Sequence, residues 1–130
     1  MDEIIAKYPK IFTDYEGNPG RVNWSIPEGW NQIVDWMCGC IQDYIDHTKT
    51  YSKGEAPISP AQVQCTQIKE KFGGLRFYTF GHNEVVDGMI KFAEYLCEKI
   101  CVNCGSMEDV EMSKGGWISP YCKKCRDKKV

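Results

Sequence analysis

The chain has 130 residues, a formal net charge of −2 and eight cysteines, and this length suits one domain with a core of its own. It has no run of 18 or more apolar residues, and acidic residues follow the first methionine in MDEIIAKYPK, so we expect a cytoplasmic protein with no membrane span and no signal peptide. Lys and Arg number 5 against 9 Asp and Glu over residues 1–65, and 11 against 9 over residues 66–130. That surplus is too small for a strong nucleic-acid binder, so nucleic-acid binding is expected to be weak or nil.

After a short N-terminal helix, the first strong helical pattern lies in SIPEGWNQIVDWMCGCIQDYIDHTKT. Ser25 and Glu28 fit a capping box, which predicts the helix start. The helix of about five turns would bury one stripe of apolar residues: Trp30, Ile33, Val34, Met37, Ile41, Tyr44 and Ile45. Trp36 projects away from this stripe, so it is either packed elsewhere or an interface anchor. A loop over residues 49–62 is predicted from its polar residues and prolines.

The segment KEKFGGLRFY, residues 69–78, interleaves basic and aromatic residues around two glycines. We expect a β-hairpin with its turn at Gly73-Gly74, which would place Lys71 opposite Arg76. Like charges in such a pair repel unless an anion lies between them, and rings beside cations suit a nucleotide. The candidate ligand-binding residues are therefore Lys69, Lys71, Arg76 and Tyr78. A hairpin with a solvated charged face is the open alternative.

His82 and Trp117 are two further candidate binding residues. His82 follows the hairpin in a loop, where binding residues often gather, and Trp117 follows two glycines in a second predicted hairpin, where its ring can stack on a ligand. A surface histidine and a packed tryptophan are the alternatives. No nucleophile–base pattern and no phosphate loop occurs in the sequence, so we expect no catalytic residues and no enzyme.

A second helix is predicted after Asn83, which can cap it. Its apolar stripe is Val86, Met89, Ile90, Ala93, Leu96, Cys97 and Ile100. The order of elements predicts an α+β fold, with helices packed on a small antiparallel sheet or hairpin over residues 1–100. Residues 101–130 would form a zinc-ribbon-like module packed on this core in one compact unit.

Two C-x2-C pairs, Cys101/Cys104 and Cys122/Cys125, are separated by 17 residues. Four thiolates at this spacing typically hold a tetrahedral Zn²⁺, and with no open position the ion is structural. Free thiols or a redox motif are lesser alternatives. The other cysteines, Cys38, Cys40, Cys65 and Cys97, are expected to be buried thiols of the core.

The motif IKEKFGGLRFY, a helix, CVNCG, GGWIS and a final C-x-x-C together resemble a family of small uncharacterised proteins encoded by bacteria and their phages. The resemblance covers about half the chain and implies a zinc-ribbon appendage and a shared site near Lys69 to Tyr78. In relatives the last metal ligand can be histidine, where this chain has Cys125.

For a small phage-type protein of the host cytoplasm, we expect a counter-defence role in which the protein sequesters a nucleotide immune signal. One alternative is an adaptor that binds a host protein or nucleic acid through the ribbon and the basic tail CKKCRDKKV. The other is a nucleotide-processing enzyme. A homo-oligomer remains open.

Overall fold

The computed structural model describes residues 2–14, 17–18, 20–49 and 59–128, so most of the predicted loop over 49–62 lies outside the described residues. The elements in chain order are α1 (Asp2–Lys7), β1 (Asn23–Ser25), η1 (Glu28–Trp30), α2 (Asn31–His47), β2 (Gln64–Lys71), β3 (Gly74–Phe80), α3 (Glu84–Cys97), β4 (Val110–Met112), β5 (Pro120–Cys122) and α4 (Lys123–Lys128). The predicted α+β class is confirmed. Within these ranges, no helix is long and apolar enough to cross a membrane.

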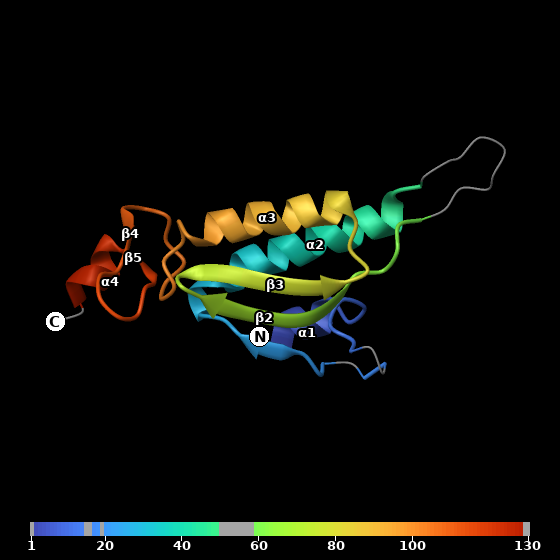
Figure 1. Cartoon of the computed structure of the whole chain (residues 1–130), viewed down its shortest axis with the longest axis horizontal. Helices are drawn as coiled ribbons and strands as arrows, with labels where there is room; N and C mark the ends of the chain where they lie inside the picture. Colours follow the sequence, from blue (N-terminus) through green and yellow to red (C-terminus); the bar gives the residue numbers. More distant parts are fainter. Residues whose placement is uncertain (1, 15–16, 19, 50–58, 129–130) are drawn as a thin grey trace.

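A three-stranded sheet in the order β1-β2-β3 forms the centre of the molecule. β2 and β3 make the predicted antiparallel hairpin, and β1 adds a short parallel pairing that the sequence did not predict. Ile68, Leu75 and Phe77 are buried and alternate with residues of the other face, as the period of two in a strand requires. α2 and α3 lie side by side along these strands (Figure 1).

The turn of the hairpin lies one residue earlier than predicted, at Phe72-Gly73, where both residues have positive φ (53° and 79°). Lys69 therefore pairs with Arg76, and Lys71 pairs with Gly74. The predicted Gly73-Gly74 turn and the Lys71–Arg76 pair are wrong. Gly73 suits this position because its φ is positive, and a Cβ there would also lie 3.0 Å from Met112 Sδ and 3.2 Å from the Ile118 carbonyl oxygen of the C-terminal module.

The two long helices begin differently from each other. Ser25 pairs with Lys69 in the sheet, and the helical segment starts with η1 after Pro27, with no side-chain cap. The capping box predicted at Ser25 is therefore wrong, because strand pairing takes that residue. Asn83 does cap α3, since its Oδ1 accepts a hydrogen bond of 2.9 Å from the Val86 amide.

The helices run antiparallel over a common core. Trp30, at the start of α2, is fully buried and donates its Nε1–H to the Ile100 carbonyl just after α3, at 3.1 Å. At the other end, Asn83 Nδ2 donates to Tyr44 Oη at 3.0 Å. The predicted stripes on both helices supply ten of the twenty buried residues of the described core. Ile33, Tyr44, Met89 and Leu96 are only partly buried.

The C-terminal module lies at one end of the sheet and helices, next to the hairpin turn (Figure 1). Its strands β4 and β5 pair antiparallel, and the amides of Gly29 and Val102 bond to the carbonyls of Val102 and Pro120, at 2.9 and 3.0 Å. A Cβ on Gly29 would lie 2.1 Å from the Cys101 carbonyl oxygen. Glycine at position 29 therefore allows the module to pack closely on the core.

Candidate functional site

The four predicted metal ligands come together in the C-terminal module. Their sulfur atoms, from Cys101, Cys104, Cys122 and Cys125, all lie within 4.8 Å of one another, and Cys104 Sγ and Cys122 Sγ are 3.6 Å apart. Four sulfurs at about 2.3 Å from one tetrahedral ion would lie about 3.8 Å from each other. The cluster has the geometry to hold a metal ion.

The environment of the cluster favours one thiolate. Burial opposes ionisation of Cys101, but the backbone amides of Cys122, Cys104 and Asn103 hydrogen-bond its sulfur, and together with the Cys125 thiol they lower its pKa to about 6. Burial and the neighbouring thiols raise the pKa of Cys125 to about 12. A metal binds thiolates, so it must displace the remaining protons, and its affinity will rise with pH.

Three of the four other cysteines are core thiols as predicted. Cys38, Cys65 and Cys97 are buried, and burial raises the pKa of all three, to about 12 for Cys65 and Cys97. Cys40 was predicted to be buried with them, and that prediction is wrong. It is exposed because its helical position points between α2 and α3, where a groove takes the place of packed core.

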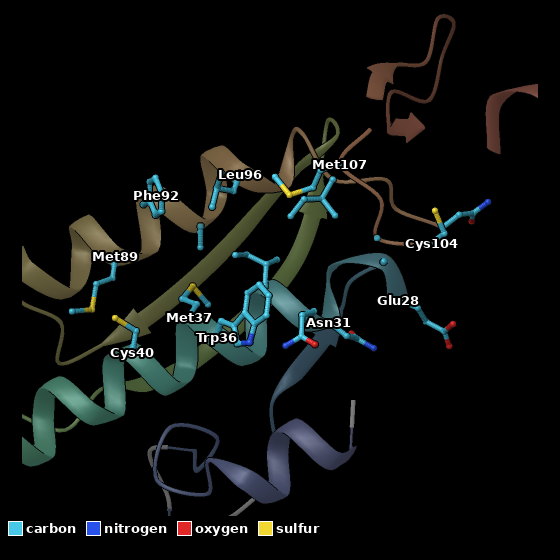
Figure 2. A pocket seen from close by; sticks show the side chains of 17 residues that line it. Glu28, Asn31, Trp36, Met37, Cys40, Met89, Phe92, Leu96, Cys104 and Met107 are labelled. Atoms are coloured by element: carbon cyan, nitrogen blue, oxygen red, sulfur yellow. The ribbon is translucent and has the colours of Figure 1, made fainter. Parts of the chain in front are cut away.

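This groove, of about 920 Å³, runs between α2 and α3 and reaches the four-cysteine module. Figure 2 shows its apolar side chains: Trp36, Met37 and Cys40 come from α2, Met89, Phe92 and Leu96 from α3, and Met107 from the segment after Cys104. The side chains of Trp36 and Phe92 are 65% and 64% exposed. Two large apolar side chains on either side of a concave apolar surface are typical of a binding site.

Polar side chains gather at one end of the groove, beside the cysteine module. They are Glu28, Asn31, Gln32 and Asn103, and within the described ranges none of these side chains forms a hydrogen bond or an ion pair. Glu28 is the one charged residue among the described residues that line the groove. The groove therefore combines a long apolar floor with one weakly acidic end.

The predicted nucleotide-binding residues of the hairpin lie on the face of the sheet opposite Leu75 and Phe77. Lys69 and Arg76 face each other, Tyr78 is exposed, and Lys71 Nζ lies 5.6 Å from the centre of the Phe72 ring. Arg76 Nη1 donates to the Leu75 carbonyl at 3.1 Å. Arg76 and Glu98 both approach Gly74. A Cβ added to Gly74 would lie 3.0 Å from Arg76 Nη1 and 3.6 Å from Glu98 Oε1.

The charge of Arg76 is therefore partly compensated within the protein. Glu98 lies close to it, and the pKa of Glu94 is raised by burial but lowered in part by hydrogen bonding to the Phe77 amide and by the Arg76 charge. The basic tail shows the same pattern, since Arg126 pairs with Asp109 at 3.2 Å and with Glu111 at 3.8 Å.

His82 and Trp117 come from segments outside the β2–β3 hairpin. His82 follows the end of β3 and its Nδ1 lies 3.1 Å from Thr79 Oγ1. Trp117 belongs to the ribbon loop and lines a small cleft near β1. Of the six predicted ligand-binding residues, Trp117 alone lines the groove or this cleft among the described residues.

Sequence reasoning missed the groove, although it singled out Trp36 as off the stripe. Phe92 gives the same signal, because it is a large apolar residue outside the predicted apolar stripe of the second helix. No protein-family model, curated protein sequence or solved structure matches the chain.

Proposed function

We propose that the protein is a non-enzymatic adaptor that binds an amphipathic helix of a partner protein in the groove between α2 and α3, with a structural Zn²⁺ in the four-cysteine cluster. The observation that carries the proposal is the pair of exposed side chains, Trp36 and Phe92, beside an apolar groove of about 920 Å³. Grooves between helices commonly take the apolar face of a partner helix.

The composition of the groove favours a basic helix. Met37, Met89 and Met107 line it, and methionine adapts to different apolar side chains because it is unbranched and polarizable. Glu28 offers a carboxylate with no ion pair among the described residues, so a lysine or the N-terminal end of the bound helix would be attracted there.

A zinc ion in the four-cysteine cluster would stabilise one wall of the same groove. Asn103, Cys104, Gly105 and Met107 line the polar end of the groove, and they belong to the first C-x2-C knuckle or follow it directly. Four thiolates select zinc over the hard cations Mg²⁺ and Ca²⁺. A zinc ion would hold this wall of the groove in place, and it would have no open position for catalysis.

Binding of a designed helical peptide tests this proposal. The probe is an idealised amphipathic Leu/Lys peptide of about 18 residues, roughly five helical turns, and its control carries serine in place of leucine at the same charge. The wild-type protein should bind the Leu/Lys peptide and not the Ser/Lys peptide in a fluorescence polarisation titration.

Three variants test whether the peptide binds in the groove. Trp36→Ala and Phe92→Ala should each weaken binding by about tenfold or more, as expected for central aromatic anchors. Phe80→Ala removes another exposed aromatic residue, on β3, and should leave affinity unchanged. Equal affinity for the two peptides, or equal effects of the three variants, would overturn the proposal. So would a particle of twice the monomer mass that dissociates on Trp36→Ala, since the groove would then be filled by a second copy.

A second candidate function is the sequestration of a nucleotide signal by the hairpin, as in a counter-defence protein. The specific observation is the Lys69–Arg76 pair, in which two cations face each other across the ladder with Tyr78 on the same face. Arg76 can grip a phosphate through its planar fork. This candidate ranks second because Glu94 and Glu98 already lie close to Arg76.

Calorimetric titration of cyclic and ADP-ribose-type nucleotides tests the second candidate. Wild type should bind one of them and release it intact, Arg76→Ala should not bind, and Lys10→Ala, at an exposed N-terminal position, should bind like wild type. Binding that survives Arg76→Ala would exclude the hairpin. Recovery of a cleaved nucleotide would indicate an enzyme.

A further inference from the structure

A second, smaller cleft of about 360 Å³ lies where β1 and the end of β2 meet the C-terminal module, called the ribbon below. Three aromatic residues line it, Trp24 from β1 and Trp117 and Tyr121 from the ribbon, together with the carboxylate of Glu70 on β2. Trp117 is 75% exposed, a high fraction for the largest apolar side chain. This cleft is separate from the groove between α2 and α3, so an inference about it is independent of the proposed adaptor function.

Glu70 is a half-buried carboxylate without a cationic partner in the described part of the chain. Its Oε1 accepts a hydrogen bond of 2.8 Å from the Gly73 amide in the turn. Its neighbours Lys69 and Lys71 point to the opposite face of the sheet, because successive strand residues alternate. A carboxylate in partly apolar surroundings is stabilised by a cation, and none of the described residues that line this cleft is a Lys or Arg.

The three aromatic residues favour the same kind of ligand. The face of an aromatic ring carries partial negative charge and attracts cations, alkylammonium groups in particular. An anion would be repelled by Glu70, and a neutral apolar ligand would remove water from the carboxylate without replacing its interactions. The ring set and the carboxylate together therefore select a cation with an apolar coat.

We infer that this cleft binds an alkylammonium group, with Trp117 and Trp24 against its methyl or methylene groups and Glu70 opposite its charge. Two sources can supply this chemistry: the side chain of a lysine, plain or methylated, on a partner chain, or a free quaternary ammonium compound. The cleft spans both parts of the molecule, since Trp24 and Glu70 belong to the sheet and Trp117 and Tyr121 to the ribbon. Its ligand would link the ribbon to the core.

The experiment follows the indole N–H signals of the protein by NMR during titration with choline chloride, and in separate arms with short peptides that carry lysine or trimethyllysine. Sodium chloride at matched ionic strength is the reference. The Trp117 signal should move with at least one ammonium probe and not with sodium chloride. Choline alone would indicate a free ligand, and a peptide alone a partner chain.

Two variants and a control complete the test. Trp117→Ala should weaken binding by about tenfold or more, and because the side chain is exposed the variant should fold. Glu70→Gln keeps an oxygen for the Gly73 amide and removes the charge, and should weaken binding several-fold. Phe80→Ala removes an exposed aromatic side chain outside the cleft and should bind like wild type. Signals that move equally with sodium chloride, no movement with any probe, or unchanged affinity in Trp117→Ala would each overturn the inference.

Discussion

Gly29 lies at the contact between the core and the C-terminal module, and its replacement by alanine tests how that contact is made. The added Cβ would lie 2.1 Å from the Cys101 carbonyl oxygen and 2.6 Å from the Val102 carbonyl group. These backbone atoms cannot rotate away, so the two segments must move apart by roughly 1 Å to restore van der Waals contact. That movement would also weaken the Gly29–Val102 hydrogen bond of 2.9 Å.

The expected cost follows from these two effects. Overpacking typically costs about 1 to 3 kcal/mol, and the loss of one backbone hydrogen bond about 1 kcal/mol. Gly29→Ala should therefore lower the free energy of unfolding by about 2 to 4 kcal/mol. Gly88→Ala is the matched control, because Gly88 lies in α3 and, apart from its chain neighbours and the nearby backbone of the helix, no described atom lies within 4 Å of its added Cβ. It should raise stability by about 0.5 to 1 kcal/mol.

Urea unfolding followed by far-UV circular dichroism, with zinc present throughout, measures both variants. The two substitutions are chemically identical, so only the surroundings of each glycine distinguish them. If Gly29→Ala is no less stable than Gly88→Ala, the close packing of the module on the core is not as described.

Three further predictions test other parts of the molecule. Wild type should carry one zinc ion per chain and Cys122→Ser should lose it, measured by atomic emission, because a tetrahedral site needs all four thiolates; full zinc content in the variant, or none in wild type, would contradict the assignment. Phe72→Asn should stabilise the protein by about 0.5 to 1 kcal/mol in thermal unfolding, since asparagine accepts the positive φ of 53° better than phenylalanine; a loss of stability would contradict it. Burial raises the pKa of Glu94 above its ordinary value, so its stabilising contribution is present at low pH and is lost as pH rises through the raised pKa. Glu94→Gln should gain stability over wild type as the pH of urea unfolding is raised, and a constant difference would contradict this.

Features that depend on nearby residues could be predicted from the sequence. The apolar stripes of both long helices, the Asn83 cap and the four clustered cysteines follow from helical periodicity, from one side chain reaching the first turn, and from the C-x2-C spacing. Each of these patterns repeats at a fixed spacing along the chain or involves residues of one helix turn.

Features that depend on distant packing could not be predicted. The hairpin turn lies at Phe72-Gly73, and Met112 and the Ile118 carbonyl of the C-terminal module lie next to Gly73 there. Ser25 is in a strand because it pairs with Lys69, far along the chain. The groove depends on how α2 and α3 pack together, which leaves the side chains of Trp36 and Phe92 exposed between them. The periodicity of one helix does not contain this information.

The methyl groups of the methionines give the most direct measurement of helix binding in the groove. Met37, Met89 and Met107 line the groove, whereas Met112 lies on β4 beside the hairpin turn and serves as an internal control. In a titration of methyl-labelled protein with the Leu/Lys peptide, the account predicts that the NMR signals of the three groove methionines shift together and saturate, while that of Met112 stays in place. A shift of Met112 with the groove signals unchanged would contradict the account.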